Sequence, residues 1–500
     1  MISRPYPLIL ALTCALAALS HTPCRGASSR LHPAAAMPVP ASRDRILILA
    51  PHCDDDAVAC GGLIAEAVAA RAAVHIAYIT NGDGFRVVAE KVFSETSVPP
   101  QDYLKLAALR QREALAAASE LGVPRRQVTF LGYPDRGSEP MWLYHWDPGH
   151  PFTGPYTRAD HNPYQTSLRP GAPYAGRSLL DDLETVIRRF RPTIVITGHP
   201  ADHHPDHSTL YCYTVAALHE LDLLHRVRLY AYLVHRADKW RSPSGRLLDP
   251  TSPPDREDEC NTQWLTLPLD SRAQRLKRAA INDLRTQMLV MKDSLLNFAR
   301  DRELFGRLPA PDLLLLNPAG GAPTDRDWKQ SLWGLLSPAL RDPRGDVAGL
   351  DPPPAADIVA LSLARGPRGL LLRLDLAGPP SPQLEYRVHL SLLLKGAVGP
   401  PRTYAIKVNH PSPGLDLRVA GTALELNLPL PEHPPLAGVI IAAETCRGPS
   451  QLDRTAWVLL GAPAWPPLWP RARSPRAGSS AGPAGGAPGL TEPGTRRSRR

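Results

Sequence analysis

Residues 45–56 read RILILAPHCDDD, and this stretch decides how the chain folds. Its first half is a short apolar run, which is typical of a strand buried on both faces of a sheet. A histidine and three carboxylates follow directly, at His52 and at Asp54 to Asp56. In open α/β sheets ligands bind at the carboxyl ends of the strands, so these side chains would lie at a binding site. Taken alone, the cluster favours a capped turn, because aspartate is common where helices start.

A second cluster changes this interpretation. Residues 193–197 read TIVIT, another β-branched strand pattern, and residues 198–207 continue as GHPADHHPDH. Seven of the 17 histidines fall between positions 199 and 235, which is far more than an even spread would place there. Imidazole and carboxylate groups both bind divalent metals, with zinc as the default choice. Two strand ends that both carry such groups indicate two halves of one metal site.

Strand and helix patterns alternate around these clusters. Strands are predicted at 46–50, 74–80, 127–131, 193–197 and 228–234, and helices near 62–71, 103–121, 179–190 and 208–221. This alternation predicts an α/β fold with a Rossmann-like, mostly parallel sheet and helices on both faces. No G-x-G-x-x-G follows the first strand, so we expect no dinucleotide. Residues 136–176 form a long irregular insertion, and residues 271–307 again have a helical pattern.

The pattern changes from residue 357 onward. Short, often alternating segments are separated by Gly and Pro, and they predict strands at 358–363, 370–376, 386–394, 404–408, 415–419, 424–428, 439–443 and 456–460. We therefore expect a C-terminal all-β, sandwich-like domain.

The two ends of the chain differ in composition from the segments between them. Arg4 precedes an apolar run at 7–19, which has the length of a signal-peptide core and is too short to span a bilayer. We expect a secreted or periplasmic protein with no integral membrane span. The predicted division is a signal peptide at 1–25, a linker at 26–43, an α/β domain at 44–310, a linker at 311–355, the β-sandwich at 356–462 and a disordered basic tail at 463–500. The seven cysteines include no C-x-x-C pair, and their spacing assigns no disulfide.

The net charge of +9 is concentrated at the C-terminus. Residues 471–500 hold seven arginines and one glutamate, a balance of +6. The remainder of the chain is nearly balanced, so we infer no nucleic-acid partner.

The two His/Asp clusters resemble the motifs of the PIG-L/LmbE family of metal-dependent de-N-acetylases. The family's His-Pro-Asp-Asp-Glu corresponds to residues 52–56, HCDDD, and its His-Pro-Asp-His is matched in full at 204–207. Cys53 and Asp56 depart from that pattern. Further family-like pieces at 80–84, 110–113 and 131–135 extend the resemblance over roughly residues 45–307.

The resemblance implies a role for each matching position. The implied metal ligands are His52, Asp55 and His207, for Zn²⁺ with Fe²⁺ as the alternative. Asp54 would act as the general base, His204 would stabilise the oxyanion or protonate the leaving amine, and Asp206 would orient His204. The implied substrate-binding residues are Arg110 and Asp135.

Three alternatives stay open at this point. Arg110 and Glu113 have the spacing of a pair along a helix. Asp135 also suits a simple turn. The aromatic residues of the segment 133–164 would form either a sugar-stacking wall or the insertion's own small core.

The function implied by the family is a zinc-dependent hydrolase that removes the N-acetyl group from an N-acetylglucosamine-type sugar or glycoconjugate. One alternative is a catalytically weak glycan-binding protein. Another is a metal-dependent amidase that acts on a non-sugar acylated metabolite. The oligomeric state is not predicted.

Overall fold

The computed structural model describes residues 34–235, 247–254, 260–311, 313–315, 333, 338–349, 351–366, 369–409, 416–429 and 435–461. They all belong to one compact unit, Met1–Leu468, and the second unit, Trp469–Arg500, lies outside them. The predicted signal peptide, the basic tail and most of the 311–355 linker also lie outside the described residues. The predicted domain boundaries therefore stay predictions. Within the described ranges, every helix is too short or too polar to cross a membrane.

The larger sheet is mixed but mostly parallel, as the sequence predicts. Its eight strands run in the order β1-β7-β8-β6-β5-β2-β3-β4. Their bounds are β1 Ala35–Ala36, β2 Arg45–Ala50, β3 Ala73–Thr80, β4 Val128–Tyr133, β5 Ile194–Gly198, β6 Arg228–Tyr232, β7 Gln263–Pro268 and β8 Arg302–Arg307. Strands β2 to β6 pair in parallel, whereas β8 is antiparallel to β6 and β7.

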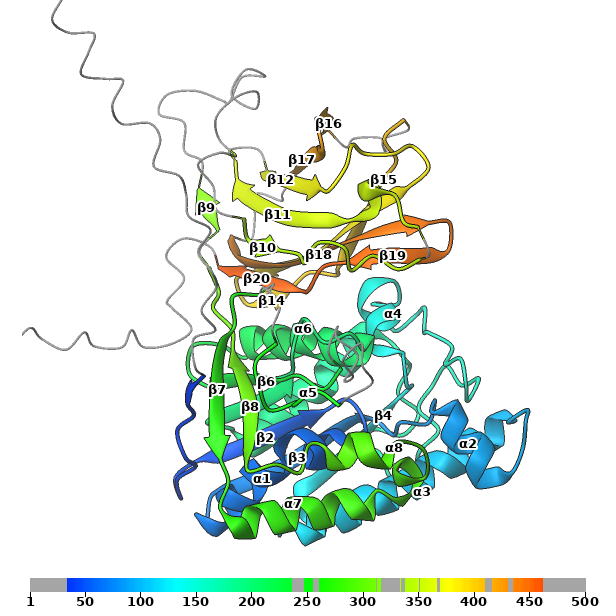
Figure 1. Cartoon of the computed structure of the whole chain (residues 1–500), viewed down its shortest axis with the longest axis vertical. Coiled ribbons are helices and arrows are strands. Elements are labelled where there is room, and N and C mark those ends of the chain that lie inside the picture. The colour runs from blue at the N-terminus through cyan, green and yellow to red at the C-terminus, as the bar shows by residue number, and fades with distance from the viewer. Residues whose placement is uncertain are drawn as a thin grey trace, which may run out of the picture. The chain divides into compact units, whose positions relative to one another are not determined.

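Helices cover both faces of this sheet. Figure 1 shows α1, α3 and α7 on one face and α5 and α6 on the other. The helix bounds are α1 Asp55–Ala69, α2 Arg86–Phe93, α3 Pro100–Glu120, α4 Ser138–Leu143, α5 Gly176–Phe190, α6 Pro205–Glu220, α7 Ser271–Asp283 and α8 Arg285–Leu296.

The strand order places the two His/Asp clusters next to each other. From β2 the chain passes to β3 and β4 on one side and then returns to β5 on the other side of β2. The carboxyl ends of β2 and β5 therefore flank a topological switch point, where open α/β sheets bind their ligands. Ile46 pairs with Ile194 and Ile48 with Ile196, so the two strands end at similar heights.

Two elements differ from the sequence prediction. The first helix begins at Asp55, seven residues before the predicted start near residue 62, and it includes Gly61 and Gly62. A Cβ at Gly62 would lie 2.3 Å from a Leu269 methyl, so this glycine serves close packing inside the helix and does not interrupt it. Residues 302–307 form strand β8 where a helix was predicted, because pairing with β7 overrides the local preference.

The C-terminal part contains two sheets that are antiparallel except for the parallel pair of β9 and β11, which agrees with the predicted all-β class. One sheet has the order β10-β11-β12-β17-β16, with β9 added to β11, and the other has the order β14-β13-β18-β19, with β15 and β20 added. The bounds are β9 Leu314–Leu315, β10 Leu340–Arg341, β11 Ile358–Arg365, β12 Gly369–Leu376, β13 Glu385–Leu394, β14 Ala397–Val398, β15 Arg402–Ile406, β16 Asp416–Ala420, β17 Ala423–Pro429, β18 Leu436–Arg447, β19 Ser450–Arg454 and β20 Val458–Gly461. Buried residues such as Leu372 and Ile441, one from each sheet, belong to the same apolar core.

Candidate active site

Three side chains from two distant segments meet at the switch point. His52 lies in the turn after β2, Asp55 is the first residue of α1, and His207 lies in the first turn of α6. Nδ1 of His52, Oδ2 of Asp55 and Nε2 of His207 are each 3.3 Å from the other two. A tetrahedral ion with bonds of about 2.0–2.1 Å separates its ligand atoms by roughly 3.4 Å. These three atoms therefore fit a single divalent cation and leave one side open.

Local sequence brings His207 to this position. Pro205 occupies the first position of α6, where its missing N–H is not needed. Gly198 ends β5, and a Cβ there would lie 2.5 Å from the His207 carbonyl oxygen. Only glycine lets the start of α6 approach the strand so closely.

Asp202 contacts His207 on the side of the ring that faces away from the other two ligand atoms. Its Oδ2 lies 3.3 Å from Nδ1 of His207, and its Oδ1 lies 3.1 Å from Nδ1 of His235. Asp202 also accepts the backbone N–H groups of Val234 and His235, each at 3.0 Å. Burial by itself lowers the pKa of His207, but the charges of Asp55 and Asp202 outweigh it and raise this pKa to about 10. The sequence reasoning missed Asp202. The rule that a ligand histidine usually has a carboxylate partner could have pointed to it.

Asp54 faces the pocket and does not cap the helix. It occupies the N-cap position of α1, yet its side chain makes no capping hydrogen bond. Its Oδ2 lies 3.2 Å from Nη2 of Arg110 and accepts Nε2–H of Gln287 at 3.1 Å. Glu113 accepts two hydrogen bonds from Thr286, whereas the Arg110 guanidinium contacts Asp54 and the Gly82 carbonyl oxygen. Gln287 is a second residue at this site that the sequence reasoning did not assign.

Asp206 contacts a different histidine from the one expected. Its carboxylate lies 3.3 Å from Nε2 of His52 and accepts the N–H groups of Arg136 and Ser138 at 2.7 and 2.9 Å. Contact with His204 runs through the main chain, since Nδ1 of His204 accepts the Asp206 N–H at 3.3 Å. The expectation that the Asp206 carboxylate orients His204 is therefore replaced by a contact with His52.

The hydrogen bond from the Asp206 N–H to Nδ1 of His204 decides which tautomer the neutral His204 ring adopts. Burial and the neighbouring His52 lower the pKa of His204 to about 3, so the ring is neutral at pH 7. Because Nδ1 is an acceptor, the single ring proton sits on Nε2. His204 also lines the pocket, so it can present a donor there.

Asp135 belongs to the pocket and not merely to a turn. Its Oδ2 accepts the Gly84 N–H at 3.0 Å, and its Oδ1 lies 3.7 Å from Nε2 of His52. Burial raises the pKa of Asp135, but the hydrogen bond to His52 and the charge of His52 outweigh it and hold this pKa well below its usual range.

Cys53 and Asp56 are the two residues that depart from the family motif. Both lie outside the triangle formed by the ligand atoms of His52, Asp55 and His207, which we call the metal triangle. The Cys53 side chain is buried, with Sγ 3.8 Å from the Thr80 carbonyl oxygen. Asp56 is fully buried, and burial raises the pKa of its carboxyl to about 7. The described cysteines are all free thiols.

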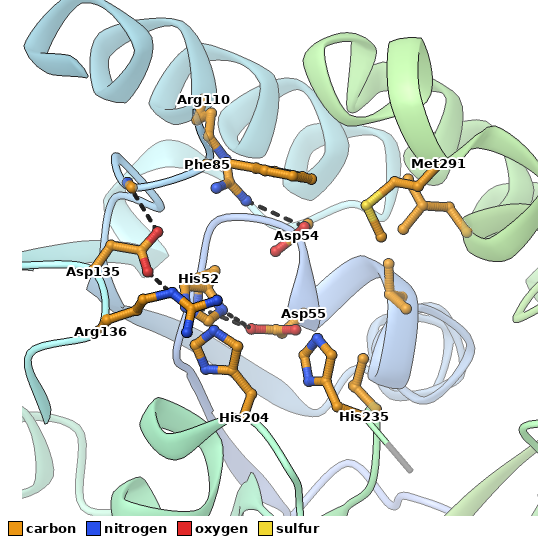
Figure 2. Close-up of a pocket in the computed structure, with 14 residues that line it drawn as sticks. His52, Asp54, Asp55, Phe85, Arg110, Asp135, Arg136, His204, His235 and Met291 are labelled. Atoms are coloured by element: carbon orange, nitrogen blue, oxygen red, sulfur yellow. Dashed lines mark hydrogen bonds and ion pairs between the residues drawn. The ribbon is translucent and has the colours of Figure 1, made fainter. Parts of the chain in front are cut away.

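A cavity of about 270 Å³ opens over the metal triangle. Figure 2 shows its labelled residues, with Asp135 and Arg136 on one side, Met291 on the other, and Asp54 and Asp55 between them. The residues that line it are His52, Asp54, Asp55, Val58, Gly84, Phe85, Arg110, Asp135, Arg136, His204, Val234, His235, Met291 and Leu295.

The insertion aromatics do not form a sugar-stacking wall. None of them lines this cavity. Trp142 is fully buried, and Trp146 and Phe152 pack against the main apolar core. The core alternative is therefore the better description, although the core that these residues join is that of the sheet.

The remaining histidines of the second cluster have structural contacts. Nε2 of His199 lies 2.9 Å from Oγ1 of Thr262, and the His203 N–H donates to the His235 carbonyl oxygen at 3.0 Å. Both lie outside the triangle.

Comparison with known proteins gives one family match and several relatives. Residues 47–218 match the family model described as PIG-L, GlcNAc-PI de-N-acetylase. The 1D-myo-inositol 2-acetamido-2-deoxy-alpha-D-glucopyranoside deacetylase of Kribbella flavida is 30% identical over 207 residues, which are 41% of this chain and 59% of that protein. The chain thus spans about three fifths of the length of this relative.

Similar solved structures include the N,N'-diacetylchitobiose deacetylase of Pyrococcus horikoshii, at 19% identity and a TM-score of 0.32, covering 53% of this chain and 83% of the other. They also include the 4-carboxy-2-hydroxymuconate hydratase of Pseudomonas putida, at 18% identity and a TM-score of 0.33, covering 51% and 82%.

Proposed function

We propose that this chain, whose residues 47–218 belong to the PIG-L family of de-N-acetylases, is a metal-dependent hydrolase that releases acetate from an N-acetylglucosamine-type sugar or glycoconjugate. The observation that carries the proposal is the 3.3 Å triangle of His52, Asp55 and His207, of which His52 and Asp55 line the cavity while His207 is fully buried. Asp54 and His204 line that cavity too.

The donor set supports Zn²⁺ as the ion, with Fe²⁺ as the alternative, because two imidazoles and one carboxylate leave a coordination position open. Such an ion would supply an acidified water and a polarised amide carbonyl. The protein's own residues then have to move two protons and hold the substrate.

Asp54 is proposed to accept the proton of the attacking water. Its Oδ2 is held by Arg110 and Gln287, while the side chain stays 15% exposed towards the cavity. An ionised carboxylate within reach of the water is the usual arrangement for a general base. Arg110 is only 3% exposed and also donates to the Gly82 carbonyl oxygen, so we assign it to holding Asp54 in preference to contacting sugar.

His204 is proposed to act at the other end of the amide. As the water oxygen bonds to the carbonyl carbon, its Nε2–H would donate first to the carbonyl oxygen and then to the nitrogen as the C–N bond breaks. The products are a carboxylate and a free amine. Asp135 and Arg136 would bind hydroxyl groups of the sugar on their side of the cavity.

Secretion or a periplasmic location is a further proposal, and it rests on the signal-like pattern at residues 1–25.

The test measures acetate release from N-acetylglucosamine, N,N'-diacetylchitobiose and N-acetylglucosaminyl-inositol. We expect release from at least one of them, its loss after treatment with a chelator, and its return on adding Zn²⁺ or Fe²⁺. Metal analysis should find about one ion per chain, bound less well by a His207→Ala variant. Acetate release that persists in fully demetallated protein would overturn the proposal.

A further inference from the structure

The cavity has a polar half and an apolar half, with the metal triangle between them. Asp135 and Arg136 lie on one side in Figure 2, and Met291 lies on the opposite side. The apolar half is formed by Val58, Phe85, Val234, Met291 and Leu295, which come from four separate parts of the α/β fold.

Helix α8 aligns this apolar half with the proposed base. Gln287, Met291 and Leu295 all belong to α8, and the backbone at Met291 is non-helical, with φ −138° and ψ 32°, so the helix is kinked there. Gln287 donates to Asp54, and the two apolar residues continue from there along the cavity wall. Val58 faces them from α1, one turn after Asp54. The apolar surface therefore begins where the scissile amide would lie and leads away from the polar half.

An acetyl group ends in one methyl and cannot cover five such side chains. Sugar hydroxyl groups need hydrogen-bond partners, which Asp135 and Arg136 offer and the five apolar side chains do not. The acyl substituent of the amide is thus the part of the substrate that suits the apolar half.

We propose that the apolar half is an acyl-chain subsite, and that the preferred substrate is an amino sugar carrying an N-acyl chain longer than acetyl. This inference rests on the proposed function, because it assumes amide hydrolysis at the metal triangle. The reaction is unchanged: water's oxygen joins the acyl carbon, the C–N bond breaks, and the amine nitrogen takes the proton. The products are a fatty carboxylate and the free amino sugar.

The test is a series of N-acetyl, N-butyryl, N-hexanoyl and N-octanoyl glucosamine, assayed with the metal-loaded full chain. Burying one methylene is worth about fourfold in kcat/KM, so the hexanoyl substrate should exceed the acetyl substrate by more than about tenfold. Hexanoate should also inhibit at a concentration at least about tenfold lower than acetate does.

Matched variants test whether the preference for longer acyl chains depends on the apolar half of the cavity. Leu295→Ala and Met291→Asp should each lower the ratio of hexanoyl to acetyl kcat/KM by about tenfold. Leu289, on the same helix but 56% exposed and outside the cavity, provides the control, and Leu289→Ala should leave both the ratio and the acetyl rate unchanged. Thermal unfolding of each variant checks that a lost ratio does not reflect a lost fold.

The outcomes separate the two proposals. If acetyl substrates are cleaved and the ratio is one or less, the acyl-chain subsite is refuted while the proposed function stands. If metal-loaded protein cleaves no N-acyl glucosamine and neither N,N'-diacetylchitobiose nor N-acetylglucosaminyl-inositol, both are refuted. A high ratio that Leu295→Ala leaves intact would also refute the subsite.

Discussion

The Asp202 carboxylate lies 3.3 Å from Nδ1 of His207, on the side of the ring opposite to the metal triangle. The same carboxylate binds Nδ1 of His235 and two N–H groups that follow β6. It therefore connects the start of α6, which carries the proposed metal ligand His207, to the end of the neighbouring strand β6. Replacing Asp202 tests how strongly its contacts hold His207 in the position of a metal ligand.

Asp202→Asn should lower metal affinity about 10–100-fold, because a neutral amide replaces the negative charge that orients the His207 ring. Competition with a chromogenic chelator measures the affinity directly. The spectrum of the Co²⁺-substituted protein reports the ligand geometry independently of activity. An Asp202→Glu variant that recovers part of the affinity would support a positioning role, whereas affinity unchanged in both variants would contradict it.

Asp54→Asn should reduce kcat by about 10²–10⁴-fold while the metal stays bound, since the amide cannot accept the water's proton. Single-turnover acetate release and metal analysis on the same sample distinguish loss of the base from loss of the ion. Robust activity in a metal-loaded Asp54→Asn protein would remove Asp54 from its assigned role.

His204 should be the Nε2–H tautomer in the metal-free protein, because Nδ1 accepts the Asp206 N–H. Its pKa of about 3 means that the neutral ring persists throughout the range from about pH 5 to 8. Two-bond ¹⁵N–¹H NMR correlations can identify the tautomer and follow it with pH. A protonated Nδ1, or titration of this ring near pH 6.5, would disprove the assignment.

Asp56→Asn should stabilise the protein at high pH. The folded-state pKa of about 7 is raised above the unfolded value of 3.8, so the protonated form contributes stability that is complete below pH 3.8 and is lost as pH rises through 7. The asparagine variant does not ionise, and its advantage in unfolding free energy should grow by about 1.4 kcal/mol per pH unit towards about 4 kcal/mol at pH 8. Urea unfolding in the presence of a chelator at several pH values measures it. An advantage that does not change with pH would exclude ionisation of Asp56 as the cause.

The sequence predicted the five strands β2 to β6 and most of the helices, and the family resemblance named His52, Asp55 and His207, whose side chains the structure brings together. Each strand carries its own apolar run, and parallel strands bring their carboxyl ends to one edge, so local patterns sufficed to bring the segments of His52 and His207 together. The same logic correctly predicted the short alternating strands of the C-terminal sheets. It failed at the start of α1, which lies at Asp55 and not near residue 62, and at residues 302–307, where pairing with β7 overrides local preference.

Only the tertiary structure decided which side chains surround the triangle. Asp54 meets Gln287 across 233 residues of sequence, and His235 reaches Asp202 only because β6 lies beside β5. Contacts of this kind produce no periodic pattern in the sequence, because they depend on how separate helices and strands pack against one another. The same holds for Met291 and Leu295 of α8, which resemble ordinary core residues until the fold places them in the lining of the cavity that also contains Asp54.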